Sequence, residues 1–297
     1  MANTSYPDDP TDILRDVLQL ERVDADEHSS TFKGFTPDQT RGQVFGGQVM
    51  AQSLVAASHS VEPDRLLHSM HCYFIRPGDA SVPLNIKVDH HRDGRSFSVR
   101  HVEVTQHNKV ILSLTCSFQL ESDGVVHQEP MPEGIPLPDD LPPISSLVGM
   151  IDDPAAQDLA YNRPFDIRYA YEPIFLRPGS EKVNRNIVWM KTFTPVNVSR
   201  NVAGAALAYV SDYTLLESIL RNHGLSWIEP KKSIASLDHA MWFHRPFNLD
   251  EWLLFVQESP SAQSARGLGM GRIYTINGDL VATVAQEGMI RLPQFDQ

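Results

Sequence analysis

The chain has 297 residues, with 25 Lys+Arg against 37 Asp+Glu, so its formal net charge is −12. The 41% apolar and 21% charged content supports a packed core and excludes an intrinsically disordered chain. No apolar run is long enough to span a membrane, and the negative charge disfavours nonspecific binding to nucleic acid. The amino-terminal residues lack the basic and apolar parts of a secretory signal, and the chain has only two cysteines. We therefore expect a cytoplasmic protein that neither inserts into membranes nor binds nucleic acid.

A proline-rich segment divides the chain into two parts of similar size. Residues 121–145 contain six prolines and several acids, without a helical or alternating apolar period. This composition is typical of an extended surface linker. The sequence therefore predicts an amino-terminal domain of residues 1–120, a linker of residues 121–160 and a carboxy-terminal domain of residues 161–297.

The two parts have the same order of features, as expected for an internal duplication. In each part, a helical segment precedes a run ending in Arg-Pro, and strand-like runs follow. Three pairs of matching positions are separated by 169 to 171 residues: Arg76 and Arg245, Val110 and Leu280, and Arg95 and Arg266. Three matches in order make chance similarity an insufficient explanation.

Each part is predicted to contain one central helix and a mostly antiparallel sheet. The helical segments are residues 45–57 and 205–220, and residues 187–193 are rich in β-branched and aromatic side chains. Asn277-Gly278 predicts a tight hairpin in which both central residues have positive φ. A sheet wrapped around one apolar helix is the hotdog architecture. We therefore predict an α+β fold with two hotdogs in tandem.

Six motifs, occurring in order, resemble those of the acyl-CoA thioesterase II family. They are RGQVFGGQVMAQSL, HSMHCYFIRPGD, the SD of YVSDYTLL, LDHAMWFHRPFNLDEWLLF, SARGLGMGRIY and VAQEGMIR. The resemblance implies a double-hotdog hydrolase of fatty acyl-CoA thioesters. It also implies three catalytic groups: an Asp on the second-half helix, a Thr or Ser before an Asp-His pair, and a Gln near the carboxy terminus. They fall on Asp212, Ser236 and Gln286, with Ser236 where the family commonly has Thr.

The residues themselves support a special role for Asp212. At 100° per residue it shares the apolar helix face of Ala208 and Leu215, whereas Glu217 falls on the far side. A carboxylate in an apolar stripe is costly unless it is paired or functional. Desolvation would raise its pKa, which suits a general base near neutral pH. Alternatively, Asp212 is a structural residue paired with backbone or with Ser211.

Gln286 and Ser236 are also polar groups among apolar neighbours. Period-two counting places Gln286 on the strand face of Val284, and Ser236 on the face of Ala240. Each has a structural explanation when taken alone. Together with Asp212, they could hold one water molecule for attack on a thioester, with the carboxylate as proton acceptor.

The first half lacks all three polar groups. Residues 41–61 contain no Asp or Glu, while Gln286 corresponds to Cys116 and Ser236 to Leu67. We therefore expect the second half to carry catalysis, and the first half to carry packing and binding.

Substrate-binding candidates are Gly46, Gly47, Asp238, His239 and Arg266. The two glycines open the first helix and either donate N–H groups to the thioester oxygen or simply allow a tight helix start. The Asp-His pair is expected to position the strand beneath Ser236. The basic residues that could bind CoA phosphates are Arg76, Arg92, Arg95, Arg266, Lys231 and Lys232.

We expect an acyl-CoA substrate, no metal, no cofactor, no covalent enzyme intermediate and a homo-oligomer. No Cys/His spacing matches a zinc site. One alternative is a hotdog-type enoyl-CoA hydratase or dehydratase that uses Asp238 and His239 as acid and base. The other is a non-catalytic acyl-thioester binder.

Overall fold

The computed structural model describes residues 7–37, 42–175, 177–227 and 233–292. Its strands are β1 (Leu20–Ala25), β2 (Ser29–Gly34), β3 (Arg65–Phe74), β4 (Leu84–Asp93), β5 (Phe97–Gln106), β6 (Lys109–Leu120), β7 (Phe165–Tyr169), β8 (Arg185–Thr192), β9 (Ser233–Ser236), β10 (Asp238–Phe243), β11 (Leu253–Gln263), β12 (Arg266–Thr275) and β13 (Leu280–Arg291). Its helices are α1 (Thr11–Val17), α2 (Gly46–Ser58), α3 (Ile144–Val148), α4 (Pro154–Tyr161), α5 (Arg200–Ser211) and α6 (Glu217–His223), with a 3-10 turn at Pro138–Asp140.

The described strands form one antiparallel sheet of two matching halves. Their order is β1-β2-β4-β5-β6-β3-β10-β13-β12-β11-β8-β7, and β9 pairs with β13 beside this path. The halves join where β3 pairs with β10, and Met70 lies opposite Met241 at that junction. Reading outward from the junction, each half presents the strand that follows its central helix, then a hairpin and further strands. The predicted tandem hotdog is confirmed.

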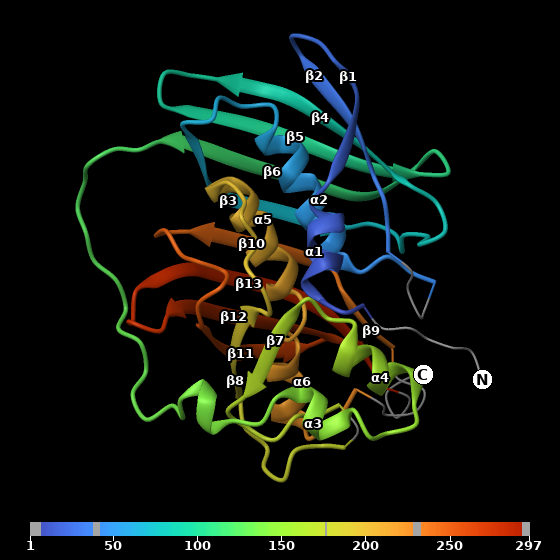
Figure 1. The fold of residues 1–297 in the computed structure, drawn as a ribbon, viewed down its shortest axis with the longest axis vertical. Helices are drawn as coiled ribbons and strands as arrows, with labels where there is room; N and C mark the ends of the chain where they lie inside the picture. Colours follow the sequence, from blue (N-terminus) through green and yellow to red (C-terminus); the bar gives the residue numbers. More distant parts are fainter. Residues whose placement is uncertain (1–6, 38–41, 176, 228–232, 293–297) are drawn as a thin grey trace.

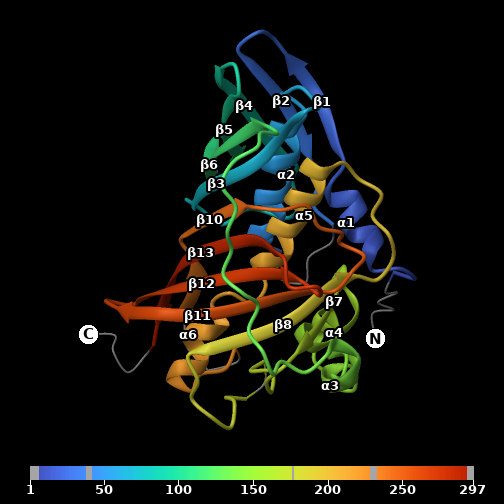
Figure 2. The same cartoon turned by 90° about the vertical axis from the view of Figure 1, so that its left-hand side faces the viewer.

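The helices α2 and α5 lie side by side against one face of this sheet (Figures 1 and 2). They run antiparallel: a Cβ on Gly47, near the start of α2, would lie 2.5 Å from the Tyr209 carbonyl near the end of α5. Every residue of α2 from Gly47 to Ala57 is buried. A helix buried on all sides is expected between a sheet and a second helix.

A repeated contact supports the duplication. Arg76 Nη1 donates to the Val110 carbonyl at 2.6 Å, and Arg245 Nη1 donates to the Leu280 carbonyl at 3.0 Å. These residues are two of the three pairs of matching positions in the sequence. Each arginine therefore binds the start of the equivalent strand in its own half.

The hairpin predicted at Asn277-Gly278 is present, but its turn differs from the prediction. Among these two residues only Gly278 has positive φ, at 91°. The turn spans more residues than a two-residue hairpin, because β12 ends at Thr275 and β13 begins at Leu280. The equivalent hairpin of the first half has the tighter form, with φ of 49° at His107 and 56° at Asn108.

The proline-rich segment lies against the outer face of the second half. Residues 121–137 contain neither helix nor strand. Trp189 Nε1 donates to the Pro136 carbonyl at 2.9 Å, and Gln128 Nε2 donates to the Gly278 carbonyl at 2.8 Å. The segment covers a small apolar cluster on that face: Ile187, Trp189, Leu254, Val256, Tyr274 and Leu280. The helices α3 and α4 follow, and the domain boundaries at residues 120 and 160 stay a prediction.

The prediction of one continuous helix over residues 205–220 is wrong, because the helix is interrupted at residues 212–216. α5 ends at Ser211, residues 212–216 form turns, and α6 begins at Glu217. A glycine far away in sequence permits the break: a Cβ on Gly269 of β12 would lie 2.8 Å from the Leu215 carbonyl oxygen. The turn thus approaches the sheet more closely than a side chain would allow.

In the described part of the chain, no helix combines the length and the apolar character needed to cross a membrane.

Candidate active site

Asp212, Ser236 and Gln286 meet at one point between α5, β9 and β13. Gln286 Nε2 donates to Asp212 Oδ1 and to Ser236 Oγ, each at 2.6 Å. Ser236 Oγ lies 3.4 Å from Asp212 Oδ1. Asp212 is the C-cap residue of α5, and Gln286 is fully buried. The structure therefore brings together the three groups that the sequence placed on facing apolar surfaces.

The environment makes Asp212 more basic than an ordinary aspartate. Burial raises its pKa from 3.8 to about 6, because desolvation penalises the charged form. Hydrogen bonds from Gln286, from the Gly47 backbone N–H and from Ser236 act in the opposite direction. At neutral pH the carboxylate is still ionised, yet it accepts a proton more readily than an exposed one.

Two glycines bring the start of α2 against this carboxylate. A Cβ on Gly46 would lie 2.9 Å from Asp212 Oδ2. The Gly47 N–H is hydrogen-bonded to the Asp212 carboxylate, so it already has an acceptor. That Gly46 and Gly47 donate to the thioester oxygen stays a prediction.

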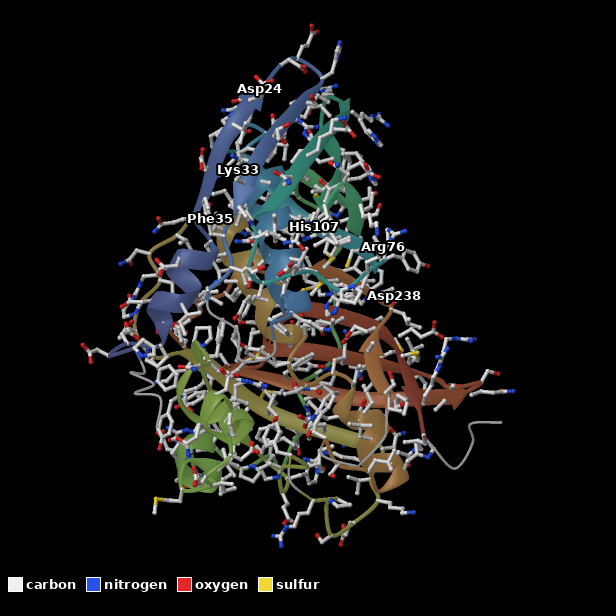
Figure 3. The ribbon with its side chains drawn as sticks, turned by 90° about the vertical axis from the view of Figure 1, so that its right-hand side faces the viewer. Asp24, Lys33, Phe35, Arg76, His107 and Asp238 are labelled. Carbon is white, nitrogen blue, oxygen red and sulfur yellow. The ribbon has the colours of Figure 1, made fainter. Side chains whose placement is uncertain are left out.

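Asp238 and His239 have separate partners. Asp238 begins β10, on the side of the molecule that faces the viewer in Figure 3, and its Oδ1 accepts a hydrogen bond from the Glu287 backbone N–H at 2.7 Å. His239 is buried, its Nε2 lies 3.1 Å from Ser211 Oγ, and burial lowers its pKa to about 3. It is therefore neutral at physiological pH. These contacts tie β10 to β13 and to the end of α5, next to Asp212.

Two of the candidate phosphate-binding residues have partners within the protein. Arg266 is half-exposed, and its Nε lies 3.0 Å from Glu287 Oε1. Arg76 binds the Val110 carbonyl, as described above. Lys231 and Lys232 lie outside the described residues. Within the described ranges, no group of three or more His, Cys, Asp or Glu side chains could hold a metal ion.

Sequence reasoning missed a buried polar network behind Asp212. Glu217 was expected on the far side of the helix but is fully buried. Its carboxylate accepts hydrogen bonds from Tyr169 Oη at 3.2 Å, Asn186 Nδ2 at 3.2 Å and Trp227 Nε1 at 3.0 Å. Burial raises the pKa of Glu217. Every residue of α6 from Glu217 to Arg221 is buried, so this helix has no solvent-facing side at Glu217.

The same network holds the turn that carries Asp212. Gln257 Nε2 donates to Thr214 Oγ1 at 2.7 Å, and Gln257 Oε1 accepts from Asn186 at 3.2 Å. Gly269 lies directly against the Leu215 carbonyl. The glycines at every second position of the strand motif Gly267-Leu-Gly269-Met-Gly271 are the one sequence signal that could have indicated this close approach.

Comparison with known proteins agrees with this architecture. A protein-family model described as acyl-CoA thioesterase matches residues 162–289, and another described as the acyl-CoA thioesterase N-terminal domain matches residues 36–119. The chain is 36% identical over 292 residues to acyl-CoA thioesterase 2 of Haemophilus influenzae, covering 96% of this chain and 100% of that protein. It is also 36% identical to human acyl-coenzyme A thioesterase 8, covering 96% of this chain and 91% of that protein.

Solved structures show the same arrangement. The acyl-CoA thioesterase II TesB2 of Mycobacterium marinum is 38% identical, with a TM-score of 0.76 over 96% of this chain and 99% of that one. The tesB protein of Mycobacterium avium subs paratuberculosis is 30% identical, also with a TM-score of 0.76, over 95% of this chain and 99% of that one. The chain therefore belongs to the acyl-CoA thioesterase II family and is a thioesterase with a tandem-hotdog fold.

Proposed function

We propose that the chain hydrolyses fatty acyl-CoA thioesters to free fatty acid and CoA by direct attack of water. Asp212 acts as the general base, and Ser236 and Gln286 position the attacking water. The observation that carries the proposal is the contact of a partly buried carboxylate with an amide and a hydroxyl, at 2.6 and 3.4 Å, within the part that matches the acyl-CoA thioesterase model over residues 162–289.

Gln286 has one hydrogen-bond acceptor that can bind the attacking water molecule. Gln286 uses its Nε2 for Asp212 and Ser236, while its buried Oε1 has no partner among the described residues. An amide oxygen accepts hydrogen bonds, so it can hold one O–H of a water while Asp212 accepts the other. Buried polar atoms are normally satisfied, which favours a bound donor at this position.

The reaction balances with these groups. Asp212 takes one proton from water while the water oxygen bonds to the thioester carbonyl carbon. The tetrahedral intermediate then collapses, the carbon–sulfur bond breaks, and the sulfur leaves with the bonding electron pair. The proton held by Asp212 goes to the departing thiolate, which regenerates the base.

The environment of His239 counts against a hydratase or dehydratase. That mechanism would need Asp238 and His239 to exchange protons with substrate. Burial lowers the pKa of His239 to about 3, and its Nε2 already contacts Ser211. Asp238 binds the backbone of Glu287 instead.

We also propose that the enzyme is cytoplasmic and forms a homo-oligomer. The outermost strand β1 is largely exposed and pairs only with β2 among the described strands, so one backbone edge is available to another chain. Sedimentation of the purified protein tests this: a monomer at micromolar concentration would contradict the oligomer.

Product analysis tests the main proposal. With octanoyl-CoA we expect free thiol and octanoate in equal amounts. With octenoyl-CoA we expect every loss of enoyl absorbance to be accompanied by release of free thiol. Hydration without thiol release would favour a hydratase, and tight binding without any product would favour a non-catalytic binder.

A single turnover in ¹⁸O-labelled water, with enzyme in excess, tests direct attack. Attack of water on the thioester places ¹⁸O in the released acid. If Asp212 instead formed an anhydride that water opens at the aspartyl carbon, the first acid released would be unlabelled. Unlabelled acid would contradict the mechanism.

A further inference from the structure

The antiparallel pair α2 and α5 has two ends of similar construction. At one end, Gly46 and Gly47 of α2 meet Asp212, the C-cap residue of α5. At the other end, the start of α5 meets His59, the C-cap residue of α2. Because the chain contains an internal duplication, this second end of the helix pair is the pseudo-symmetric counterpart of the candidate active site.

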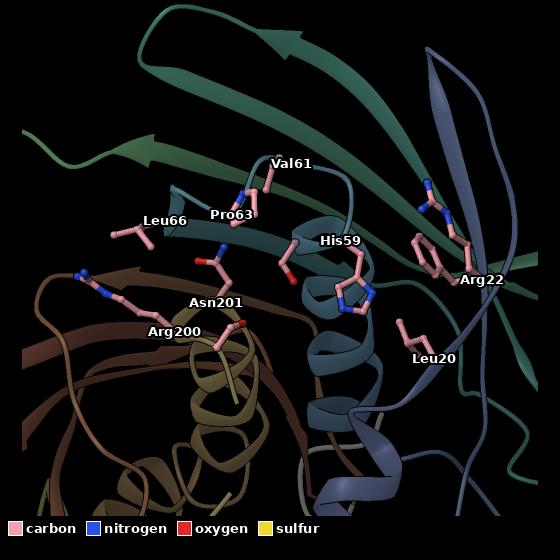
Figure 4. Close-up of a pocket in the computed structure, with 11 residues that line it drawn as sticks. Leu20, Arg22, His59, Val61, Pro63, Leu66, Arg200 and Asn201 are labelled. Carbon is pink, nitrogen blue, oxygen red and sulfur yellow. The ribbon is translucent and has the colours of Figure 1, made fainter. Parts of the chain in front are cut away.

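This second end contains a cavity of about 430 Å³ (Figure 4). A volume of this size falls within the range of pockets that hold small organic ligands. Its apolar walls come from both strands of the β1–β2 hairpin, from the chain that connects α2 to β3 and from the start of β3: Leu20, Phe32, Val61, Pro63 and Leu66.

The polar part of the lining is cationic or neutral. Arg22, His59 and Arg200 line the cavity, and no acidic side chain does. Arg22 forms no ion pair within the described part of the chain, and its guanidinium lies 6.0 Å from the centre of the Phe32 ring. Arg200 also pairs with Glu121, at 2.9 Å, outside the lining. In a protein with a net charge of −12, an unpaired arginine beside an apolar cavity favours an anionic ligand.

The cavity lacks the groups that would activate water. The helix-capping position holds the His59 imidazole in place of the Asp212 carboxylate. The positions that correspond to Ser236 and Gln286 are Leu67, beside the lining residue Leu66, and Cys116. A ligand bound there would therefore stay intact.

We propose that this cavity is a non-hydrolytic binding site for a free fatty acid. The carboxylate would lie beside Arg22 and His59, and the alkyl chain would pack against Phe32 and Leu66. The inference rests on the proposed function in one respect: the acyl class of the ligand is taken from the counterpart site.

Calorimetric titration with decanoate, below its micelle concentration, tests the site. We use wild type, Val61→Trp to fill the cavity and Arg22→Gln to remove the unpaired cation; both residues lie at the surface or only partly buried. The matched control is Arg185→Gln, an exposed arginine on β8 outside the lining. We expect Val61→Trp to abolish one decanoate site, Arg22→Gln to weaken it about tenfold as for one lost charge contact, and Arg185→Gln to leave it unchanged.

Two further measurements separate this proposal from the catalytic one. Turnover of decanoyl-CoA is expected to be the same in all four proteins, and decanol, which lacks the charge, is expected to bind at least about tenfold more weakly than decanoate. Equal decanoate binding in wild type and Val61→Trp, equal affinity for decanol, or displacement of decanoate from this site by CoA alone would overturn the proposal. Since the binding measurements do not require hydrolysis, failure of the Asp212 mechanism would leave their result interpretable.

Discussion

The two hotdogs fold in the same way but fill equivalent positions differently. In the second half, Gln286 lies opposite Gly269 across the β12–β13 pair; in the first half, Cys116 lies opposite Arg100 across the β5–β6 pair. Arg100 is 2% exposed. Its guanidinium binds Asp93 at 2.9 Å and the Ser60 carbonyl at 2.8 Å.

This difference explains how one half makes room for the proposed catalytic carboxylate. In the first half the Arg100 side chain fills the space between the strand and the chain that leaves α2. In the second half Gly269 leaves that space empty of side chain, and the turn after Asp212 occupies it. The ion pair between the buried Arg100 and the half-exposed Asp93 in the first half is thus replaced, in the second half, by a turn whose carboxylate contacts Gln286 and Ser236. A duplicated fold therefore specialises through a few positions while the sheet and its register are kept.

The largest expected effect is on turnover at the C-cap position. Asp212→Asn keeps the shape and a hydrogen-bond acceptor for Gln286 but removes the base, so kcat for thiol release should fall by about two orders of magnitude or more. The matched control is His59→Asn at the equivalent position of the first half, which should retain wild-type kcat. Equal loss in both variants, or near-normal turnover in Asp212→Asn, would contradict the division of roles.

The same substitution should stabilise the protein near neutral pH. Because burial raises the pKa of Asp212 from 3.8 to about 6, its contribution to stability is complete below pH 3.8 and is lost as the pH rises through about 6. At pH 7.5, Asp212→Asn should therefore raise the free energy of unfolding by up to about 3 kcal/mol, at about 1.4 kcal/mol per pKa unit. Urea denaturation measures this, and the gain should shrink towards pH 4. A destabilised variant at pH 7.5 would indicate a structural aspartate.

A smaller loss of turnover is expected from a change at Gly269, the position that holds Arg100 in the first half. Gly269→Ala places a Cβ 2.8 Å from the Leu215 carbonyl, so the turn that carries Asp212 must move. We expect kcat to fall by about tenfold, since small misplacements of catalytic groups are costly. Gly124→Ala, with nothing within 4 Å of the new Cβ, is the control and should have no effect. Unchanged turnover in Gly269→Ala would show that the close approach is not needed.

The smallest expected loss of turnover comes from removing the Ser236 hydroxyl. Ser236→Ala removes one hydrogen-bond partner of Gln286 and should lower kcat by about three- to tenfold, the scale of one hydrogen bond. Ser236→Thr keeps the hydroxyl and should restore most of the turnover. If both variants were equally impaired, packing around residue 236 and not its hydroxyl would be what matters.

Much of the fold could be predicted because the duplication repeats its signals. The matching arginines at 76 and 245, the strand alternation and the polar groups at 212 and 286 are all local patterns in the sequence. The break after Ser211 could not be predicted this way, because the apolar period continues through Leu215 and Leu216. Gly269, which permits the break, is on another strand, and only the folded sheet brings it next to the turn.

The burial of Glu217 was also beyond local reasoning. A helical wheel drawn through residue 212 places it outward, whereas Tyr169, Asn186 and Trp227 supply donors from three separate segments. The cavity at His59 has the same origin, since it forms only where β1 and the start of α5 come together. Tertiary partners, and not periodicity, decide such positions.

The pH dependence of kcat/KM for an acyl-CoA thioester is the most direct measurement of the role of Asp212. With Asp212 as the base, activity should rise about tenfold per pH unit below a pKa of about 6, then level off, and this limb should vanish from the residual activity of Asp212→Asn. An acid limb that persists unchanged in Asp212→Asn would show that another group takes the proton from water and would contradict the mechanism.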